Sequence, residues 1–145
     1  MPLIISVPGY EENYGSISET ITELIDLYPT LAELTGLSPH QPSILQGESL
    51  AGYLSGKENS NDNKSFAYTV SYNGKDGSLR TDQYRYTRWG EGMNKNNEEL
   101  YDHKNDPEEN RNLVHEPTQA KILAEMREQF EVIKRKAKRE INNEN

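Results

Sequence analysis

Apolar and polar residues alternate along the middle of the chain. From Phe66 to Tyr72 aromatic and aliphatic residues are separated by small or polar ones, a period-two pattern that is typical of a half-buried strand. Three more short strands are expected at 79–81, 84–89 and 100–101. Asn73-Gly74 and other turn dipeptides lie between them. Short connections between successive strands predict an antiparallel sheet of about four strands.

The last part of the chain has the spacing of a helix. Its apolar residues recur every three or four positions, at Ile122, Met126, Phe130, Ile133, Ala137 and Ile141. Pro117 suits the first helical turn, where a missing N–H costs no hydrogen bond. Glutamates precede most of the lysines and arginines, the order that the helix dipole favours. A single apolar stripe predicts that this helix lies on the sheet.

A second helix is expected near the start of the chain. If Asp26 is the N-cap, Pro29 falls in the first turn, and Gly36 is placed to end the helix. The pattern predicts a helix over about 27–35, with Leu27, Leu31 and Leu34 on its apolar face. We expect a short extended segment at 21–25 before it and one helical turn at 50–54 after it.

Leu3–Val7 is a short apolar run that Pro8-Gly9 closes. Such a run predicts a strand buried on both faces, and a strand of that kind needs neighbouring strands. Because the rest of the chain offers few candidates, we expect those neighbours to lie upstream. The sequence thus divides into residues 1–55, the end of an α/β domain, and residues 65–141, an α+β subdomain.

Composition narrows the function classes. Hydrophobic residues make up only 32% of the chain, so its core is small or is completed by another surface. A formal net charge of −8 argues against nucleic-acid binding, which relies on clustered positive charge. No apolar run approaches the roughly 20 residues of a membrane-spanning helix. Without cysteine the chain has no disulfide, no thiolate metal site and no cysteine nucleophile.

Arginines lie between aromatic residues in the segment 84–89. Period two puts Tyr84, Tyr86 and Arg88 on one face of the strand and Arg85, Thr87 and Trp89 on the other. One interpretation is recognition of an anion or a sugar, because guanidinium groups pair with sulfate or carboxylate and aromatic faces stack on sugar rings. The other is an ordinary antiparallel strand in which arginine stems cover their aromatic neighbours.

Other candidate motifs are weaker. The histidines at 40, 103 and 115 lack metal-ligand spacing, so no metal site is predicted. The alternating asparagines at 59–63 lack the glycine and the glutamate of a calcium loop. Asp106-Pro107 is interpreted as a turn, after which Leu113 anchors the chain. No serine lies in a G-x-S-x-G motif, and no catalytic residue is predicted.

Five segments together resemble the sulfatase family, most closely its iduronate-2-sulfatase-like branch. They are PLIISVPG at 2–9, ELIDLYPTLAELTGL at 23–37, LQGESL at 45–50, GSLRTDQYRYTRW at 77–89 and ELYDHKNDPEENRNL at 99–113. Their order and spacing are those of the last third of such enzymes. The resemblance implies an alkaline-phosphatase-like α/β fold, in which Leu3–Val7 is one of the last strands of the large sheet and the rest forms a small antiparallel sheet with a terminal helix.

The resemblance also implies hydrolysis of sulfate esters, as in the degradation of a glycosaminoglycan or another polysaccharide. The family uses Ca²⁺ and a formylglycine made from Cys or Ser in a C/S-x-P-x-R motif. Here the nearest match, Ser6 to Tyr10, has tyrosine in place of that arginine. The catalytic groups and metal ligands are therefore expected upstream, in an N-terminal part that would be this chain's partner, and the chain alone is expected to be inactive and to bind no cofactor.

The substrate-binding residues implied for this chain are Arg80, Arg85, Arg88, Trp89 and His103, with a sulfated carbohydrate as the substrate. The family resemblance suggests a secreted, periplasmic or lysosomal enzyme. Two other functions stay open. One is a non-catalytic acidic module that binds sugar or protein, and the other is part of an alkaline-phosphatase-like phosphodiesterase.

Overall fold

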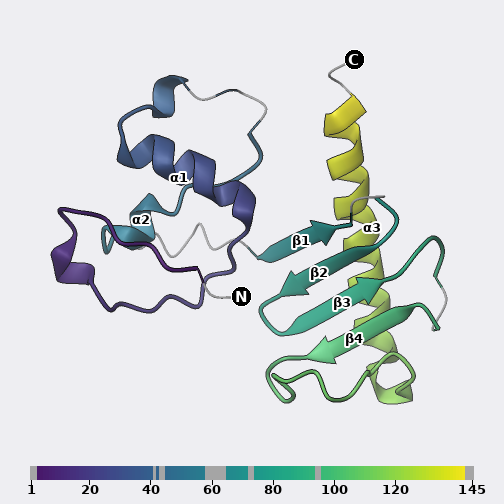
Figure 1. Cartoon of the computed structure of the whole chain (residues 1–145). Helices are drawn as coiled ribbons and strands as arrows, with labels where there is room; N and C mark the ends of the chain where they lie inside the picture. Colours follow the sequence, from purple (N-terminus) through teal and green to yellow (C-terminus); the bar gives the residue numbers. More distant parts are fainter. Residues whose placement is uncertain are drawn as a thin grey trace. The chain divides into compact units, whose positions relative to one another are not determined.

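The computed structural model describes residues 3–40, 42, 45–57, 65–71, 74–93 and 96–142. The chain forms two compact units, Met1–Lys64 and Ser65–Asn145. In Figure 1 the first unit is coloured purple to blue, and the second, teal to yellow, contains the sheet and the long helix.

The second unit is built on a four-stranded antiparallel sheet. Its strands are β1 (Phe66–Val70), β2 (Gly77–Thr81), β3 (Tyr84–Arg88) and β4 (Glu98–Asp102). Their order in the sheet is the order in the chain, so each strand pairs with the one before it. The predicted four-strand arrangement is confirmed, and the unit has the expected α+β architecture. Tyr72, expected in the first strand, lies outside the described residues.

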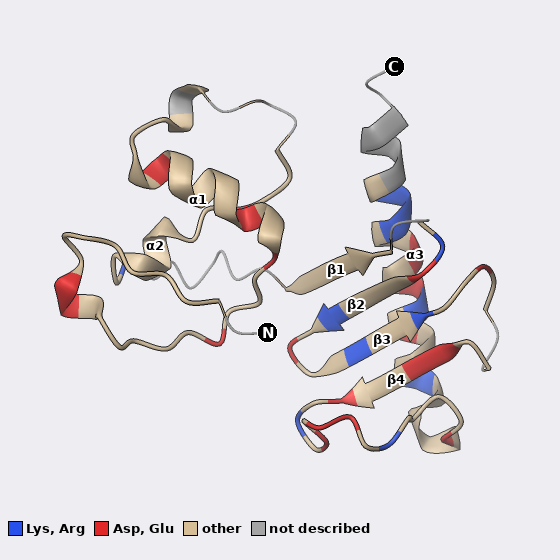
Figure 2. Ribbon diagram, viewed as in Figure 1, with Lys and Arg blue, Asp and Glu red and all other residues tan. Residues whose placement is uncertain are grey.

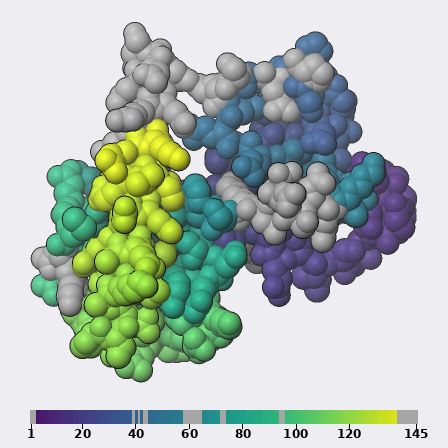
Figure 3. All heavy atoms as spheres, turned by 180° about the vertical axis from the view of Figure 1, so that it is seen from behind, coloured from purple at the N-terminus to yellow at the C-terminus, as the bar shows by residue number. Residues whose placement is uncertain are grey.

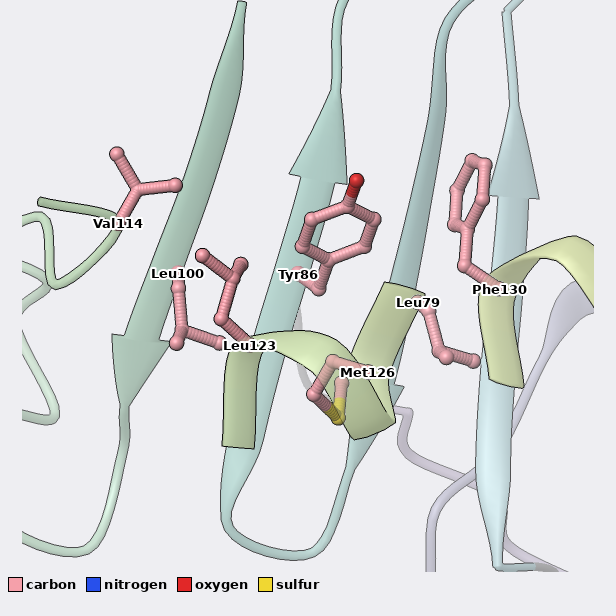
Figure 4. Close-up of a cluster of buried hydrophobic side chains, with 7 residues drawn as sticks. All are labelled: Leu79, Tyr86, Leu100, Val114, Leu123, Met126 and Phe130. Carbon is pink, nitrogen blue, oxygen red and sulfur yellow. The ribbon is translucent and has the colours of Figure 1, made fainter. Parts of the chain in front are cut away.

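One row of side chains across the sheet forms the floor of the core. Tyr68, Leu79, Tyr86 and Leu100 are neighbours in register across the four strands. Leu79, Tyr86 and Leu100 have no exposed area. Helix α3 supplies the opposing side chains. The buried cluster, drawn in Figure 4, consists of Leu79, Tyr86, Leu100, Val114, Leu123, Met126 and Phe130.

Helix α3 (Ala120–Asn142) lies against this face of the sheet, as its apolar stripe predicts (Figures 1 and 3). The 3₁₀ turn Pro117–Gln119 leads into it, so the proline does occupy the first turn. Phe130 meets the rings of Tyr68 and Tyr86 edge to face, with ring centroids 5.6 and 5.3 Å apart. A Cβ atom at Gly77 would lie 2.9 Å from Phe130 Cζ, so glycine makes this close approach of helix and sheet possible.

The free edge of β4 is covered by the segment that follows it. The Asn112 side chain accepts hydrogen bonds from the N–H groups of Leu100 and Val114, both at 3.1 Å, and donates one to the Glu98 carbonyl at 3.2 Å. The Leu113 N–H donates to the Leu100 carbonyl at 2.8 Å. Leu113 also packs against the core, so the predicted anchor at this residue is confirmed.

The first unit contains helix α1 (Leu27–Leu34) and the single turn α2 (Ala51–Leu54), close to the predicted bounds. Among the described residues of this unit there are also three 3₁₀ turns, at Glu11–Asn13, Leu24–Asp26 and Ser38–His40. Gly36 ends α1 with φ 74°, and the N–H groups of Gly36 and Leu37 donate to the carbonyls of Glu33 and Ala32, which is a Schellman motif.

The predicted apolar face of α1 is only partly buried. Leu31 is 58% exposed, whereas Asp26 and Thr30 are buried. The Asp26 carboxylate accepts the N–H groups of Glu23 (2.7 Å) and Glu48 (2.9 Å), and the Thr30 hydroxyl accepts that of Leu50 (2.9 Å). The helix therefore uses Asp26 and Thr30 to hold the 48–50 segment. Of the predicted leucines, Leu31 is exposed, whereas Leu27 and Leu34 are half-buried.

Two other segments of the first unit lack the expected structure in this chain. Leu3–Val7 pairs with none of the described residues, and Ile4 is 88% exposed; because its neighbours are expected upstream, the strand stays a prediction. The segment 21–25, expected to be extended, runs into the 3₁₀ turn Leu24–Asp26, where Glu23 and Asp26 form a capping box. The asparagines at 59–63 lie outside the described residues.

Candidate functional site

The sheet of the second unit has two chemically different faces. One faces α3, and we call the other the outer face. In register on the outer face stand Arg80, Arg85 and Tyr101, with Ser78, Thr87 and Glu99 in the next row. Tyr86 and Arg88 are buried on the α3 side, so the alternation predicted for the segment 84–89 is confirmed. Figure 2 shows basic residues on β2 and β3, with acidic residues in the loop that follows β4.

A single carboxylate joins two of the predicted site residues. Glu109 Oε1 lies 2.8 Å from Arg85 Nη1 and 2.5 Å from His103 Nε2. Arg85 is partly exposed and His103 is largely covered, with 39% and 15% of their side chains accessible. The sequence predicted Arg85 and His103 separately, and the structure brings them together through Glu109.

Arg80 stands directly opposite Arg85 in the register of β2 and β3. Its Nη1 is buried and has no hydrogen-bond partner among the residues that the structure describes. Burial and the neighbouring charge of Arg85 lower the pKa of Arg80, although Glu109 and Asp82 act in the opposite direction. Two guanidinium groups at facing positions repel each other, so this pair favours an anion between or beside them.

The loop after β4 fixes the position of Glu109. The Asp106 carboxylate accepts the N–H groups of Asn110 (3.0 Å) and Arg111 (2.9 Å), and these bonds lower the pKa of Asp106. The Glu109 N–H donates to the Asp106 carbonyl at 3.1 Å. The Asp106-Pro107 turn is thus confirmed. It leaves Glu109 with φ 57°, a left-handed conformation that is uncommon for a residue other than glycine.

Arg88 and Trp89 do not join this cluster. Arg88 is 4% exposed, lies 2.5 Å from a Glu131 oxygen and places its guanidinium 4.6 Å from the centre of the Phe130 ring. Trp89 is 52% exposed and follows Arg85 by four residues along β3, which corresponds to about 13 Å of extended chain. A ligand that touches both Arg85 and Trp89 would therefore have to be longer than one sugar ring.

Sequence reasoning missed two acidic residues. Glu109 could have been suspected, because it follows the Asp-Pro turn in a loop that comes directly after an outer strand. Glu98 gave no signal in the sequence. Its buried carboxylate accepts a 2.5 Å hydrogen bond from the Tyr86 hydroxyl and two from the Arg127 guanidinium. Tyr86, Glu98 and Arg127 thus form a charged cluster inside the second unit.

The chain does not fit the metal or the formylglycine that the family resemblance implies. It has no cysteine, and the described ranges hold no group of three or more His, Cys, Asp and Glu side chains that could bind a metal ion. No step of a reaction is therefore assigned to either group in this chain. Among the described helices, none is long and apolar enough to cross a membrane.

Comparison with known proteins places the chain among sulfatases. Residues 1–136 match the family model described as N-sulphoglucosamine sulphohydrolase, C-terminal. A curated relative, the Δ4,5-hexuronate-2-O-sulfatase of Bacteroides thetaiotaomicron, is 38% identical over an alignment of 136 positions. The alignment covers 88% of this chain and 27% of that protein. The chain thus spans about a quarter of that relative's length.

Solved structures agree with this match. A 2-O GAG sulfatase has 31% identity and a TM-score of 0.65, covering 81% of this chain and 26% of its own length. A second structure, which is bound to its substrate D-glucosamine-2-N,6-O-disulfate, has 26% identity and a TM-score of 0.64. That match covers 78% of this chain and 24% of the other. The fold is therefore that of alkaline-phosphatase-like sulfatases.

Proposed function

The chain belongs to the sulfatase family, and we propose that it forms the C-terminal part of an enzyme that hydrolyses sulfate esters of a glycosaminoglycan. Its similarity to a hexuronate-2-O-sulfatase and to a 2-O GAG sulfatase supports this substrate class. Both relatives are about four times as long as the matched region, so the activity itself would need the rest of the enzyme.

The role of this part would be substrate recognition. The observation that carries the proposal is the facing pair Arg80 and Arg85 on the outer face, with His103 joined to Arg85 through Glu109. Guanidinium groups bind sulfate and carboxylate oxygens with paired N–H donors, and a sulfated uronic acid carries both kinds of anion.

Trp89 would bind a neighbouring part of the glycan. Its exposed ring offers a face for stacking on a sugar, and the roughly 13 Å of strand between it and Arg85 suits a chain of more than one sugar. Arg88, predicted from sequence as a further substrate ligand, already has partners in the fold. We assign it to holding α3 against the sheet through Glu131 and Phe130.

Catalytic groups would come from upstream sequence. In this proposal residues 1–55 complete the large α/β domain, and residues 65–141 form the recognition subdomain. The formylglycine and the Ca²⁺ that the family uses would be held by that large domain, and they would supply the nucleophile and the positive charge for hydrolysis. This chain binds and orients the substrate.

Kinetics of the polypeptide that carries this chain at its C-terminus test the proposal. The substrate is an unsaturated disaccharide with a 2-O-sulfated uronic acid, and released sulfate is measured. Arg85→Gln is expected to lower kcat/KM at least tenfold, since it removes a charged hydrogen-bond donor to the substrate. The matched control is Arg111→Gln, an arginine whose side chain is 69% exposed and pairs with Glu116.

Each outcome decides one part of the proposal. Equal kcat/KM values for Arg85→Gln and Arg111→Gln would show that the outer face does not recognise the substrate. Binding of the disaccharide by the intact polypeptide without sulfate release would favour a non-catalytic sugar-binding protein. The 145-residue chain alone is expected to release no sulfate, and turnover by the chain alone would show that it contains catalytic groups of its own.

A further inference from the structure

Glu109 occupies the place where an anion would bind on the outer face. Its carboxylate contacts Arg85 at 2.8 Å and His103 at 2.5 Å, the distances expected for a bound oxyanion. It also lies close enough to Arg80 to influence that side chain's ionisation. We propose that Glu109 is an internal substitute for the ligand's anionic group, which leaves when a sulfate or a uronic acid carboxylate binds to Arg80, Arg85 and His103. The inference rests on the proposed function, because it describes regulation of the same site.

The charges at the site favour such an exchange. Two arginines face each other on β2 and β3, and Glu109 forms an ion pair with Arg85. Arg80 Nη1 is buried without a hydrogen bond to any described residue. Glu109 therefore does not use all the N–H donors that the two guanidinium groups offer. A tetrahedral sulfate has more oxygens than a carboxylate and could accept from the arginine that Glu109 does not reach.

The loop that carries Glu109 allows its side chain to leave without unfolding. Asp106 holds the backbone of the loop through Asn110 and Arg111, and these bonds do not involve the Glu109 side chain. The Glu109 carboxylate therefore depends on Arg85 and His103 alone for the contacts described. With 26% of its side chain exposed, it can turn towards water when another anion takes its place.

The exchange and a purely structural role for Glu109 predict opposite changes in anion affinity when Glu109 is replaced. If the carboxylate only holds Arg85 and His103 in position, its loss would loosen both side chains and weaken anion binding. If it occupies the anion position, its loss would strengthen anion binding, because a competing negative charge about 3 Å from the guanidinium disappears. The sign of the change in affinity thus separates the two roles.

Anion binding to the 145-residue chain tests the inference. Sodium sulfate and sodium glucuronate are titrated separately at constant ionic strength, and binding is followed by calorimetry and by the NMR signals of the His103 ring and the Arg85 side chain. In Glu109→Gln at least one of the two anions is expected to bind about five- to tenfold more tightly than in the unchanged chain. The anion that gains affinity identifies the group that Glu109 replaces.

Three further variants make the result specific. Glu108→Gln makes the same chemical change at the exposed neighbouring residue and is expected to change affinity less than twofold. Glu109→Gly removes the side chain where φ 57° suits glycine, and should strengthen binding as Glu109→Gln does. Arg85→Gln combined with Glu109→Gln should lose the gain.

Several results would overturn the inference. One is that both anions bind to Glu109→Gln and Glu109→Gly no more tightly than to the unchanged chain. Another is that Glu108→Gln gains as much anion affinity as Glu109→Gln does. Its failure is distinguishable from failure of the proposed function. Sulfate release by the intact polypeptide with no gain in Glu109→Gln would reject the exchange alone. A gain in affinity without any sulfate release would reject the enzymatic function alone.

Discussion

Glu98 is the buried charge on which the interior of the second unit depends. Its side chain has no exposed area, and its oxygens accept hydrogen bonds from Tyr86 and Arg127. Burial alone would raise the pKa of Glu98, but the bonds from Arg127 and Tyr86 outweigh it and lower the pKa. The carboxylate is thus held in its charged form, and the Tyr86 hydroxyl, with its raised pKa, remains the donor.

Glu98→Gln is expected to destabilise the second unit by about 2–3 kcal/mol at pH 7, because it leaves the Arg127 guanidinium without its partner. Urea unfolding followed by circular dichroism measures the effect. Glu99→Gln, the same change at the next residue and on the outer face, is expected to stay within about 0.5 kcal/mol. Similar losses in the two variants would argue against a special role for the buried cluster.

The effect of Glu98→Gln depends on pH in a defined direction. A carboxyl whose pKa is lower in the folded than in the unfolded state stabilises the protein above the unfolded value, near 4.5. That contribution is lost as the pH falls through the lower folded pKa. The difference in unfolding free energy between Glu98→Gln and the unchanged chain should therefore be constant near pH 7 and shrink below about pH 4.5. A difference that grows in acid would contradict the lowered pKa.

Single residues show where sequence reasoning succeeded. The alternation predicted from Tyr84 to Arg88 agrees with the structure, because strand geometry leaves only two choices of face. The partners of these residues could not be predicted in the same way. Arg88 meets Glu131 across 43 positions of sequence, and Glu109 contacts Arg85 from the loop that follows the next strand, so both contacts depend on how the elements pack.

Among the elements, the edge of β4 depends on one exposed side chain. Asn112→Ala is expected to cost about 1–2 kcal/mol, because it removes three hydrogen bonds to backbone groups of the strand and of Val114. Hydrogen exchange should show the Leu100 amide losing more protection than the Tyr86 amide in the central strand. Asn110→Ala is the matched control, since that side chain bonds only to Asp106 at 3.3 Å among the contacts described. Equal protection of Leu100 in the two variants would contradict this role of Asn112.

Local signals predicted elements better than long-range ones did. Helix α1 was predicted to within a residue, since Pro29 and Gly36 act within the helix or at its end. The predicted N-cap is wrong in its contacts, because the Asp26 carboxylate bonds to Glu23 and Glu48 and caps no N–H group of α1. Which side of α1 is buried was not predicted, because that side bonds to the N–H groups of Glu48 and Leu50, about twenty residues away. Leu3–Val7 also depends on long-range partners: a strand exists only beside another strand, and the neighbours expected for this one lie upstream.

At the scale of the whole molecule, the two units differ in how much they bury. Among the described residues, the buried hydrophobic side chains of the first unit are Ala32, Leu50 and Ala51, whereas the second unit buries seven in one cluster. The first unit also contains an open cavity of about 740 Å³ lined partly by Leu3, Tyr14 and Leu54. Large exposed side chains are found on and around α1, at Leu24, Ile25, Tyr28, Leu31 and Leu37.

Separate expression of the two units is expected to give unequal results. Residues 65–145 should unfold cooperatively in urea, because they contain a complete core between sheet and helix. Residues 1–64 should show no cooperative transition and should aggregate, since their apolar side chains are largely uncovered. Circular dichroism and NMR dispersion of each piece measure this. A sharp transition in residues 1–64 would show that three small buried side chains are sufficient.

The order of elements in the second unit also sets the course of its folding during synthesis. Each strand pairs with the one made just before it, so the sheet can form quickly from local contacts. The helix that covers its apolar face is synthesised afterwards, and Phe130 follows the end of β4 by 28 residues (130 minus 102). Over that interval a growing chain presents Leu79 and Leu100 to other nascent chains. A chaperone that binds the emerging polypeptide would be needed most at this stage of translation.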